Sequence, residues 1–363
     1  MSVARSASSL MISSVPAQFE AMTAEPLPRP VRMAPGAEGL PEAPRAFDYD
    51  DVSLVPRLAS SLAHRADAHP EVSLGPAHLT VPLLGSPMPD VCGVEMCQAL
   101  AEQGALGILH RFMPEAEQVA DYRRAAEAGI AGAAIGITGG YQKRFGMLLE
   151  AGCSIFCVDT ANGANQQVRQ AVRWIRSQDD SVCLIAGNVA SSETFSWLED
   201  LGVDAIRVGI AGGSVCETRT ETGVFTPTPH AVYEAASVRR RALIIGDSGI
   251  RTPSDMCKLL ALGADCVMVG SALAGTREAP GRVIVVDGKK FKIMRGAASF
   301  SVQQEFDGED PQYIEGSETM VPYKGSAADV IHRYVAGLRS SMSYMDARTL
   351  DEYRRNVSFL RLS

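Results

Sequence analysis

The sequence predicts an α/β protein built as a (β/α)8 TIM barrel, and two observations support this. Short apolar runs alternate with stretches of helical apolar spacing eight times between residues 81 and 271, which is typical of a parallel barrel. Polar residues also stand at the carboxyl ends of these runs, where such barrels place their active sites. A doubly wound sheet is the alternative, but the GxGxxG turn that usually follows its first strand is absent.

The eight predicted strands are apolar runs bounded by small or polar residues. Their ranges are 81–88, 105–110, 132–137, 154–159, 182–188, 205–210, 242–247 and 265–271. Between strands, residues 165–178 and 192–201 have the apolar spacing of amphipathic helices. Gly152, Gly202 and Gly263 each stand just before a strand, as expected for glycines that end helices. The signals for strands, helices and turns therefore agree.

The pattern changes after the eighth strand. Two apolar stretches surround an Asp-Gly-Lys turn within residues 283–293, which predicts a β-hairpin. The polar, irregular segment that follows predicts a mobile flap at about 295–323, because long irregular insertions in compact domains are usually functional lids. A helix at about 327–342 and another from about Leu350 end the chain.

Composition and charge argue against several classes of protein. Residues 47–363 are predicted as one barrel domain, and the proline- and glycine-rich residues 1–46 as a flexible arm. The first 19 residues weakly resemble a transit peptide, but Arg5 is their only basic residue. A net charge of -8 argues against nucleic-acid and membrane-surface partners. No apolar run approaches the roughly 18 residues of a membrane span. Eight cysteines without a CxxC pair favour a cytoplasmic protein over a disulfide framework.

The most informative stretch, residues 205–223, is an apolar run that breaks into a glycine-rich loop ending at Cys216. Gly209, Gly212 and Gly213 allow a tight turn and let backbone N–H groups approach an anion. A cysteine is most often a small buried hydrophobe. Here polar neighbours and a nearby cation favour the thiolate. The stretch therefore predicts a nucleophile.

This loop resembles the catalytic loop of the IMP dehydrogenase / GMP reductase family. Residues 208–223 match the family form VGIGPGS-[IV]-C-x-T-[RK]-x-x-TG from the glycines through the cysteine to the final Thr-Gly. Seven further stretches resemble family motifs in the same order: 50–56 (DDVLLxP), 86–88 (SPM), 158–163 (D-x-A-[HN]-G), 186–189 (GNV), 246–251 (ADGGIR), 270–275 (GSxxAG) and 315–325 (EGxxxxVPYKG).

Several positions depart from the family pattern. Ala211-Gly212 stand where the family usually has Gly-Pro, and residues 225–229 read Phe-Thr-Pro-Thr-Pro where it has a further glycine and Pro-Gln. Ser248 replaces the middle glycine of ADGG. Met294 stands near a tyrosine that contacts phosphate in the dehydrogenases, and residues 297–298 are Ala-Ala where Met-[GS] reads the purine base. These last departures bear on recognition of the nucleotide.

The resemblance implies a reaction at C2 of a purine 5'-monophosphate, with Cys216 as the nucleophile and Thr218 and Glu315 as the proton-transfer groups. For Glu315, an exposed surface glutamate is the alternative. The implied substrate-binding residues are Ser86, Met88, Ser214, Asp247, Ser248, Gly249, Gly270, Ser271, Arg295 and Gly296. Among them, Asp247 is expected to accept the ribose hydroxyls, while the phosphate is assigned to Ser214, Gly249, Gly270 and Ser271.

The nicotinamide cofactor is assigned by the same resemblance to Asp159, Asn188 and Arg111. Taken alone, Asp159 or Asp247 could equally be a helix N-cap. No cysteine and histidine cluster has the spacing of a metal site. A monovalent cation held by the carbonyls of Gly209, Gly212 and Cys216 is a hypothesis.

Two features favour the reductase branch. Residues 110–132 leave room only for a helix where the dehydrogenases usually carry CBS modules, although some lack them. No arginine lies between Ser299 and Glu315, where the dehydrogenase flap carries the Arg-Tyr pair that activates water. The resemblance thus implies NADPH-dependent deamination of GMP by a homotetramer or homo-octamer. The alternatives are an IMP dehydrogenase that uses NAD, a divergent paralogue for a related purine nucleotide, and a catalytically silent nucleotide-binding barrel.

Overall fold

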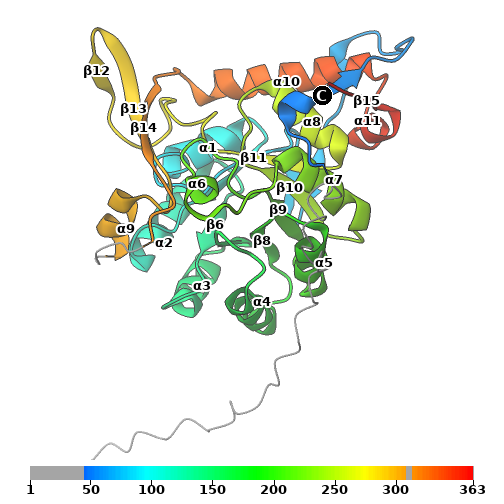
Figure 1. Ribbon diagram of the computed structural model, residues 1–363. Helices are drawn as coiled ribbons and strands as arrows, with labels where there is room; N and C mark the ends of the chain where they lie inside the picture. The colour runs from blue at the N-terminus through cyan, green and yellow to red at the C-terminus, as the bar shows by residue number, and fades with distance from the viewer. Residues whose placement is uncertain (1–44, 308–312, 363) are drawn as a thin grey trace, which may run out of the picture. The chain divides into compact units, whose positions relative to one another are not determined.

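The computed structural model describes residues 45–307 and 313–362, and its centre is a closed barrel of eight parallel strands (Figure 1). The strands are β4 (Leu83–Gly85), β5 (Leu106–Leu109), β6 (Gly132–Ile135), β7 (Ile155–Asp159), β8 (Cys183–Val189), β9 (Ala205–Val208), β10 (Leu243–Asp247) and β11 (Cys266–Val269). Each pairs in parallel with the next, and β11 returns to β4 to close the ring. The predicted (β/α)8 fold is confirmed.

Helices cover the outside of the barrel. They are α1 (Val94–Glu102), α2 (Glu115–Ala125), α3 (Tyr141–Glu150), α4 (Gln166–Gln178), α5 (Ser192–Asp200), α7 (Thr228–Val238), α8 (Pro253–Leu262) and α10 (Ala327–Tyr344). At the starts of α4, α5, α8 and α10, a side chain accepts from an otherwise unpaired N–H group of the first turn, as Ser191 does for α5 and Thr252 for α8. Their buried faces form the larger core against the strands.

A hairpin that the sequence did not predict closes the amino-terminal end of the barrel. Strands β2 (Val72–Leu74) and β3 (Ala77–Leu79) pair antiparallel and send Leu74 and Leu79 into the inner core, next to side chains from the barrel strands. The turn passes so close to β8 that a Cβ on Gly75 would lie 2.3 Å from the Cβ of Cys183. The opposite, carboxyl-terminal end is the end that stays available for a site.

The segment after the barrel is more ordered than the sequence suggested. Strands β12 (Ile284–Val286) and β13 (Lys289–Arg295) confirm the predicted hairpin, which projects from the barrel (Figure 1). The prediction of an irregular flap was wrong for much of its length, because α9 (Phe300–Asp307) and β14 (Glu318–Pro322) lie within it. Strand β14 adds to β13 as the third strand of a sheet. Residues 308–312 of the flap lie outside the described part.

The two predicted carboxyl-terminal helices are present as α10 and α11 (Leu350–Asn356). The chain then forms β15 (Ser358–Arg361), which pairs antiparallel with β1 (Val52–Val55) and so joins the first and last described segments of the chain. The sequence did not predict this pair. Residues 1–44 of the predicted arm lie outside the described residues. In the described part, no helix is long and apolar enough to cross a membrane.

Candidate active site

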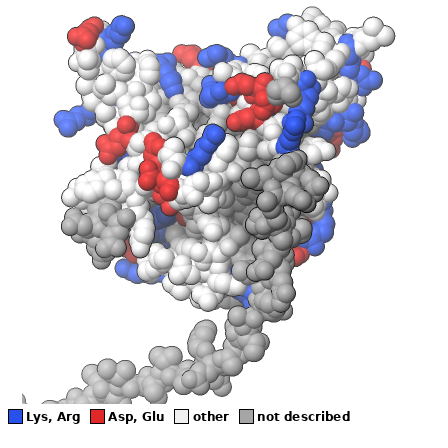
Figure 2. Space-filling view, viewed as in Figure 1, with Lys and Arg blue, Asp and Glu red and all other residues white. Residues whose placement is uncertain are grey.

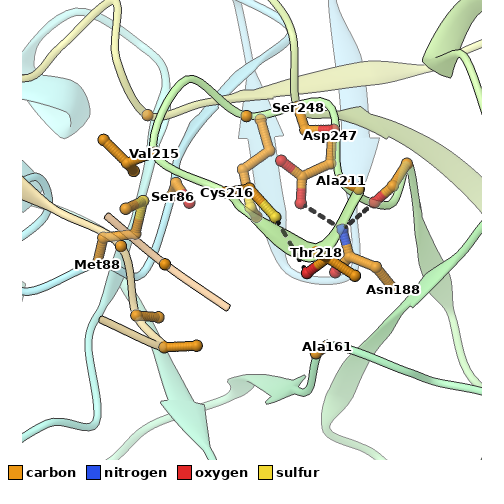
Figure 3. A pocket seen from close by; sticks show the side chains of 18 of the residues that line it. Ser86, Met88, Ala161, Asn188, Ala211, Val215, Cys216, Thr218, Asp247 and Ser248 are labelled. Atoms are coloured by element: carbon orange, nitrogen blue, oxygen red, sulfur yellow. Dashed lines mark hydrogen bonds between the residues drawn. The ribbon is translucent and has the colours of Figure 1, made fainter. Parts of the chain in front are cut away.

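A cavity of about 300 Å³ opens at the carboxyl ends of the barrel strands (Figure 3). All but one of the predicted catalytic, substrate-binding and cofactor-binding residues line it. They are Ser86, Met88, Arg111, Asp159, Asn188, Ser214, Cys216, Thr218, Asp247, Ser248, Gly249, Gly270, Ser271, Gly296 and Glu315. The exception is Arg295. The fold therefore brings into one cavity side chains that are spread over more than 200 residues of sequence.

Three side chains form a hydrogen-bonded chain at this cavity. The thiol of Cys216 donates to Thr218 Oγ1 over 3.3 Å, and the hydroxyl of Thr218 donates to Glu315 Oε2 over 2.7 Å (Figure 3 shows the first bond). All three residues are half-buried, whereas the other seven cysteines are buried. The arrangement connects a thiol that a ligand can reach to a carboxylate that can exchange protons, with a hydroxyl between them.

Backbone geometry places this chain of groups. Gly209 follows β9 at a φ of 141°, and a Cβ there would lie 1.8 Å from the carbonyl oxygen of Asp247, so only glycine fits. The flap is held against the cysteine loop by two backbone bonds, Glu217 N–H to the Glu315 carbonyl (2.8 Å) and Ser317 N–H to the Val215 carbonyl (3.0 Å). These bonds explain how a glutamate nearly 100 residues away reaches Thr218.

The opposite wall of the cavity carries a buried ion network. Arg207, on β9, donates to Asp159 Oδ1 over 2.5 Å and to Asp247 Oδ2 over 2.9 Å. The arginine and Asp247 are each 6% exposed. Burial disfavours the charged guanidinium, but the neighbouring Asp247, Cys157 and Asp159 outweigh this effect and raise the pKa of Arg207 well above its ordinary value. The arginine therefore stays charged and fixes both carboxylates.

Sequence reasoning missed Arg207, although one signal was present. A charged residue inside an apolar strand run is unusual, because an ionised group buried in a barrel must be paired. Its two partners stand on β7 and β10, which lie on either side of β9 in the barrel. Strand β10 is adjacent to β9, whereas β8 lies between β9 and β7. The pairing becomes visible only when the three strands are placed in space.

Asn188 connects this wall to the cysteine loop. Its side-chain N–H groups donate to Asp247 Oδ2 and to the Gly209 carbonyl, both over 2.8 Å. Within the described residues its Oδ1 is buried and has no hydrogen-bond partner. Nearby, Arg111 pairs with Asp159 at 3.5 Å and stacks on the Phe112 ring at 4.8 Å. The Asn188 Oδ1 atom is therefore free to accept a hydrogen bond from a ligand N–H group.

Glycine-rich turns form another part of the cavity lining. Gly249 has a φ of 75°, and a Cβ on Gly270 would lie 3.4 Å from the sulfur of Met88. Ser214 and Ser271 add hydroxyl groups. The basic residues that line the cavity, Arg111 and Arg207, are both paired to carboxylates. An anion bound at these turns would therefore be held mainly by backbone N–H and hydroxyl groups.

Arg295 does not point into the cavity, which corrects its prediction as a substrate-binding residue. Its guanidinium forms a bidentate pair with Asp90 (2.8 and 2.9 Å) and contacts Glu305 of α9 at 2.6 Å. Side chains alternate along β13, so Met294 lines the cavity while Arg295 faces the other side of the strand. The arginine instead joins the loop after β4 to the flap helix.

The described residues contain no cluster of three histidine, cysteine, aspartate or glutamate residues that could hold a metal. The carbonyl of Gly209, one of the three assigned to a monovalent cation, already accepts from Asn188, and the cation stays a hypothesis. On the face shown in Figure 2, Lys and Arg side chains are interspersed with Asp and Glu rather than gathered into one basic surface.

Comparisons with known proteins agree with this geometry. Residues 46–363 match the family model of the IMP dehydrogenase / GMP reductase domain. The chain is 35% identical to inosine-5'-monophosphate dehydrogenase of Halalkalibacterium halodurans over 286 residues, which are 74% of this chain and 58% of that protein. It is 40% identical to the enzyme of that name from Aquifex aeolicus over 245 residues, which are 64% of this chain and 49% of that protein. The chain thus spans about half the length of these curated relatives.

Among solved structures, the chain resembles a variant of GMP reductase from Trypanosoma brucei in complex with guanosine 5'-monophosphate. The TM-score is 0.84 at 26% sequence identity, and the match covers 89% of this chain and 96% of that one. The family match spans the whole described barrel together with its flap. The chain therefore belongs to the IMP dehydrogenase / GMP reductase family.

Proposed function

We propose that this protein is a GMP reductase, which converts GMP, NADPH and two protons into IMP, NADP⁺ and ammonium. The observation that carries the proposal is the hydrogen-bonded chain from Cys216 through Thr218 to Glu315. Deamination at C2 needs a nucleophile and, next to it, a group that protonates the departing amine. Cys216 supplies the nucleophile, and Glu315, two hydrogen bonds away through Thr218, supplies the proton.

The residues would act in sequence at one carbon atom. As Cys216 adds to C2 of the purine, its thiol proton passes through Thr218 to the Glu315 carboxylate. The same proton, returned through Thr218, lets the amino group leave as ammonia. The enzyme is then joined to the base by a C–S bond. A bound nicotinamide cofactor would supply the hydride that attacks C2. As the C–S bond breaks, its electron pair returns to Cys216 as thiolate, and IMP is released.

The barrel wall would hold the nucleotide and the cofactor. Oδ2 of Asp247 accepts from Asn188 and Arg207, which leaves Oδ1 to accept from the ribose hydroxyls. The phosphate fits the glycine-rich turns at Ser214, Gly249, Gly270 and Ser271. The nicotinamide amide can donate to the unpaired Asn188 Oδ1, beside Asp159 and Arg111.

The second candidate is IMP dehydrogenase, which would oxidise IMP with NAD. The identity of 35–40% to proteins of that name favours it. Two observations argue against it. The flap carries no arginine between Ser299 and Glu315 that could activate water. Glu315 is hydrogen-bonded to Thr218, as the proton transfer of a reductase requires. A third candidate is a divergent paralogue that acts on a related purine nucleotide. Its basis is the alanine pair at residues 297–298, which lines the cavity at the family positions that read the purine base.

The experiment that tests the proposal is absorbance at 340 nm with purified full-length protein. NADPH loss with GMP, release of ammonia and IMP, and no reaction by a Cys216→Ala variant would support the reductase. NADH formation with IMP and NAD alone would establish the dehydrogenase instead. Nucleotide binding without turnover of any purine nucleotide would favour a silent barrel. We also propose a homotetramer or homo-octamer, which light scattering would test.

A further inference from the structure

Three departures from the family pattern meet at one place beneath the cysteine loop. They are Gly212 in place of proline, Thr228 within the segment that usually reads Pro-Gln, and Ser248 in place of glycine. Thr228 is the first residue of α7 and Ser248 follows β10 directly. Ser248 adopts a left-handed φ of 78°, which strains any residue except glycine. Such strain persists where surrounding contacts hold it, often at functional sites.

The two hydroxyl groups contact each other and the loop above them. Ser248 Oγ and Thr228 Oγ1 are 3.3 Å apart, and Thr228 is 2% exposed. The Thr228 hydroxyl also lies 3.4 Å from the carbonyl oxygen of Asp247. The Ser248 hydroxyl occupies the space next to two loop glycines, because a Cβ built on Gly209 would lie 3.1 Å from it and one built on Gly212 would lie 2.8 Å from it.

These distances show that the residues at positions 212, 228 and 248 share one small volume, so each limits which side chains the other two positions can hold. A side chain at position 212 would meet Ser248 Oγ at 2.8 Å and Thr228 Oγ1 at 3.1 Å, closer than carbon and oxygen atoms pack. A proline at 212 and the observed hydroxyl pair therefore compete for one volume. Glycine at 212 leaves that volume to the half-buried serine, and the serine gives the buried threonine hydroxyl a hydrogen-bond partner.

We propose that Ser248 and Thr228 form a hydroxyl pair that positions the loop carrying Cys216, in the volume that the family pattern assigns to a proline. The pair joins the end of β10, which carries Asp247, to the start of α7 and to the turn at residues 209–212. It thereby sets the nucleophile relative to the carboxylate expected to bind the ribose. Both residues are positioning residues, and the proposal rests on the proposed function only in taking Cys216 as the nucleophile.

The first test is a double-mutant cycle of Ser248→Ala, Thr228→Val and the double variant, with Thr228→Ser as the variant that keeps the hydroxyl. Loss of one neutral hydrogen bond is expected to lower kcat about fivefold. Because the two hydroxyls act as one unit, the double variant should lose no more than either single variant. Thr228→Ser should keep the wild-type kcat. Losses that multiply in the double variant, or a Thr228→Ser variant as slow as Thr228→Val, would overturn the proposal.

The second test uses the competition for volume. Gly212→Ala should lower kcat by pushing the Ser248 hydroxyl aside, and adding Ser248→Gly should cause no further loss of kcat, because the hydroxyl pair is already broken. Ser248→Gly alone relieves the left-handed strain, so its Tm should not fall while its kcat does. A kcat that merely follows Tm, or a double variant slower than Gly212→Ala, would show that the pair serves stability alone.

A readout that needs no substrate separates this proposal from the proposed function. The rate of Cys216 alkylation by iodoacetamide, followed by mass spectrometry, should change by the same factor in Ser248→Ala, Thr228→Val and their double variant. If GMP is not turned over but this pattern appears, the proposed function fails and the positioning pair stands. An unchanged alkylation rate together with an unchanged kcat would reject the pair whichever nucleotide is the substrate.

Discussion

The two sides of the cavity are built in different ways. On the barrel wall, Asp159, Arg207 and Asp247 stand on strands and form buried ion pairs. On the reactive side, Cys216 and Glu315 come from a loop and the flap, are half-buried, and meet through neutral and singly charged hydrogen bonds around Thr218. The difference lies in what holds each side. The wall is held together by ion pairs between barrel strands, while the reactive groups meet through contacts between the loop and the flap.

If the wall depends on its ion network, removing Arg207 should have the largest effect on stability. Arg207→Leu leaves two carboxylates without their shared cation, and the loss of one partner from a buried ion pair costs about 3–5 kcal/mol. We expect the free energy of unfolding, measured by urea denaturation, to fall by this amount. Cys216→Ser, on the reactive side, should change it by less than about 1 kcal/mol.

The cause of that loss can be isolated. In the double variant Arg207→Leu/Asp247→Asn, one of the stranded negative charges is gone, so part of the lost stability should return. A double variant that is less stable than Arg207→Leu by the full cost of both changes would mean that packing, not charge, holds this wall together.

A buried neutral histidine makes the barrel sensitive to acid. His110, at the end of β5, is 7% exposed, and burial lowers its pKa to about 4, with Asp90 opposing this shift and Arg295 adding to it. The unfolded chain therefore takes up this proton near pH 6.5 and the folded chain only near pH 4. Stability is lost as pH falls through this window, by about 3 kcal/mol at pH 4.

Comparison of wild type with His110→Asn isolates this effect from the titration of carboxylates. In urea denaturation at pH 7, 5 and 4, the wild type should lose about 3 kcal/mol more than the variant between pH 7 and pH 4. His78→Asn, at an exposed position, should follow the wild type. Parallel curves for wild type and His110→Asn would show that His110 is not held neutral in the folded protein.

The fold could be predicted from the sequence because its signals are local. Each barrel strand is a short apolar run with its own turn residues, so the strand ranges needed no knowledge of distant partners. The pairing of β1 with β15 could not be found in this way, since residues 52–55 and 358–361, apart from the buried Val52, are exposed or half-buried and lie about 300 residues apart. Strand β14 was missed for a similar reason, because its side chains are mostly exposed.

The same distinction applies to the site. The motif around Cys216 includes Thr218, the separate motif at residues 315–325 includes Glu315, and the structure brings the three side chains together. Arg207 was missed because its role depends on three strands meeting in space. Arg295 was misassigned because a motif gives its position in the sequence but not the face of β13 on which it lies.

On the reactive side, we expect Glu315→Gln to affect the rate rather than the stability. The amide can still accept from Thr218 but cannot donate a carboxyl proton, and the loss of a general acid lowers kcat about 100-fold. Steady-state kinetics and urea denaturation of the same preparation would measure both quantities. Glu318→Gln, three residues along the same segment and exposed, is the matched control and should retain activity. Equal losses in both variants would indicate general damage to the flap.

The smallest expected effect concerns how firmly the flap lies against the wall. Phe306 of α9 meets Phe112 with ring centroids 6.0 Å apart, and Phe112 lines the cavity. An aromatic pair contributes about 1 kcal/mol, so Phe306→Ala should make exchange about fivefold faster at the amides of Glu217 and Ser317, which join loop and flap. Phe300→Ala removes a 44% exposed ring from the same helix and should leave that exchange unchanged. If Phe306→Ala also leaves exchange unchanged, the flap is held by its backbone bonds alone, and the reactive side is as fixed as the wall.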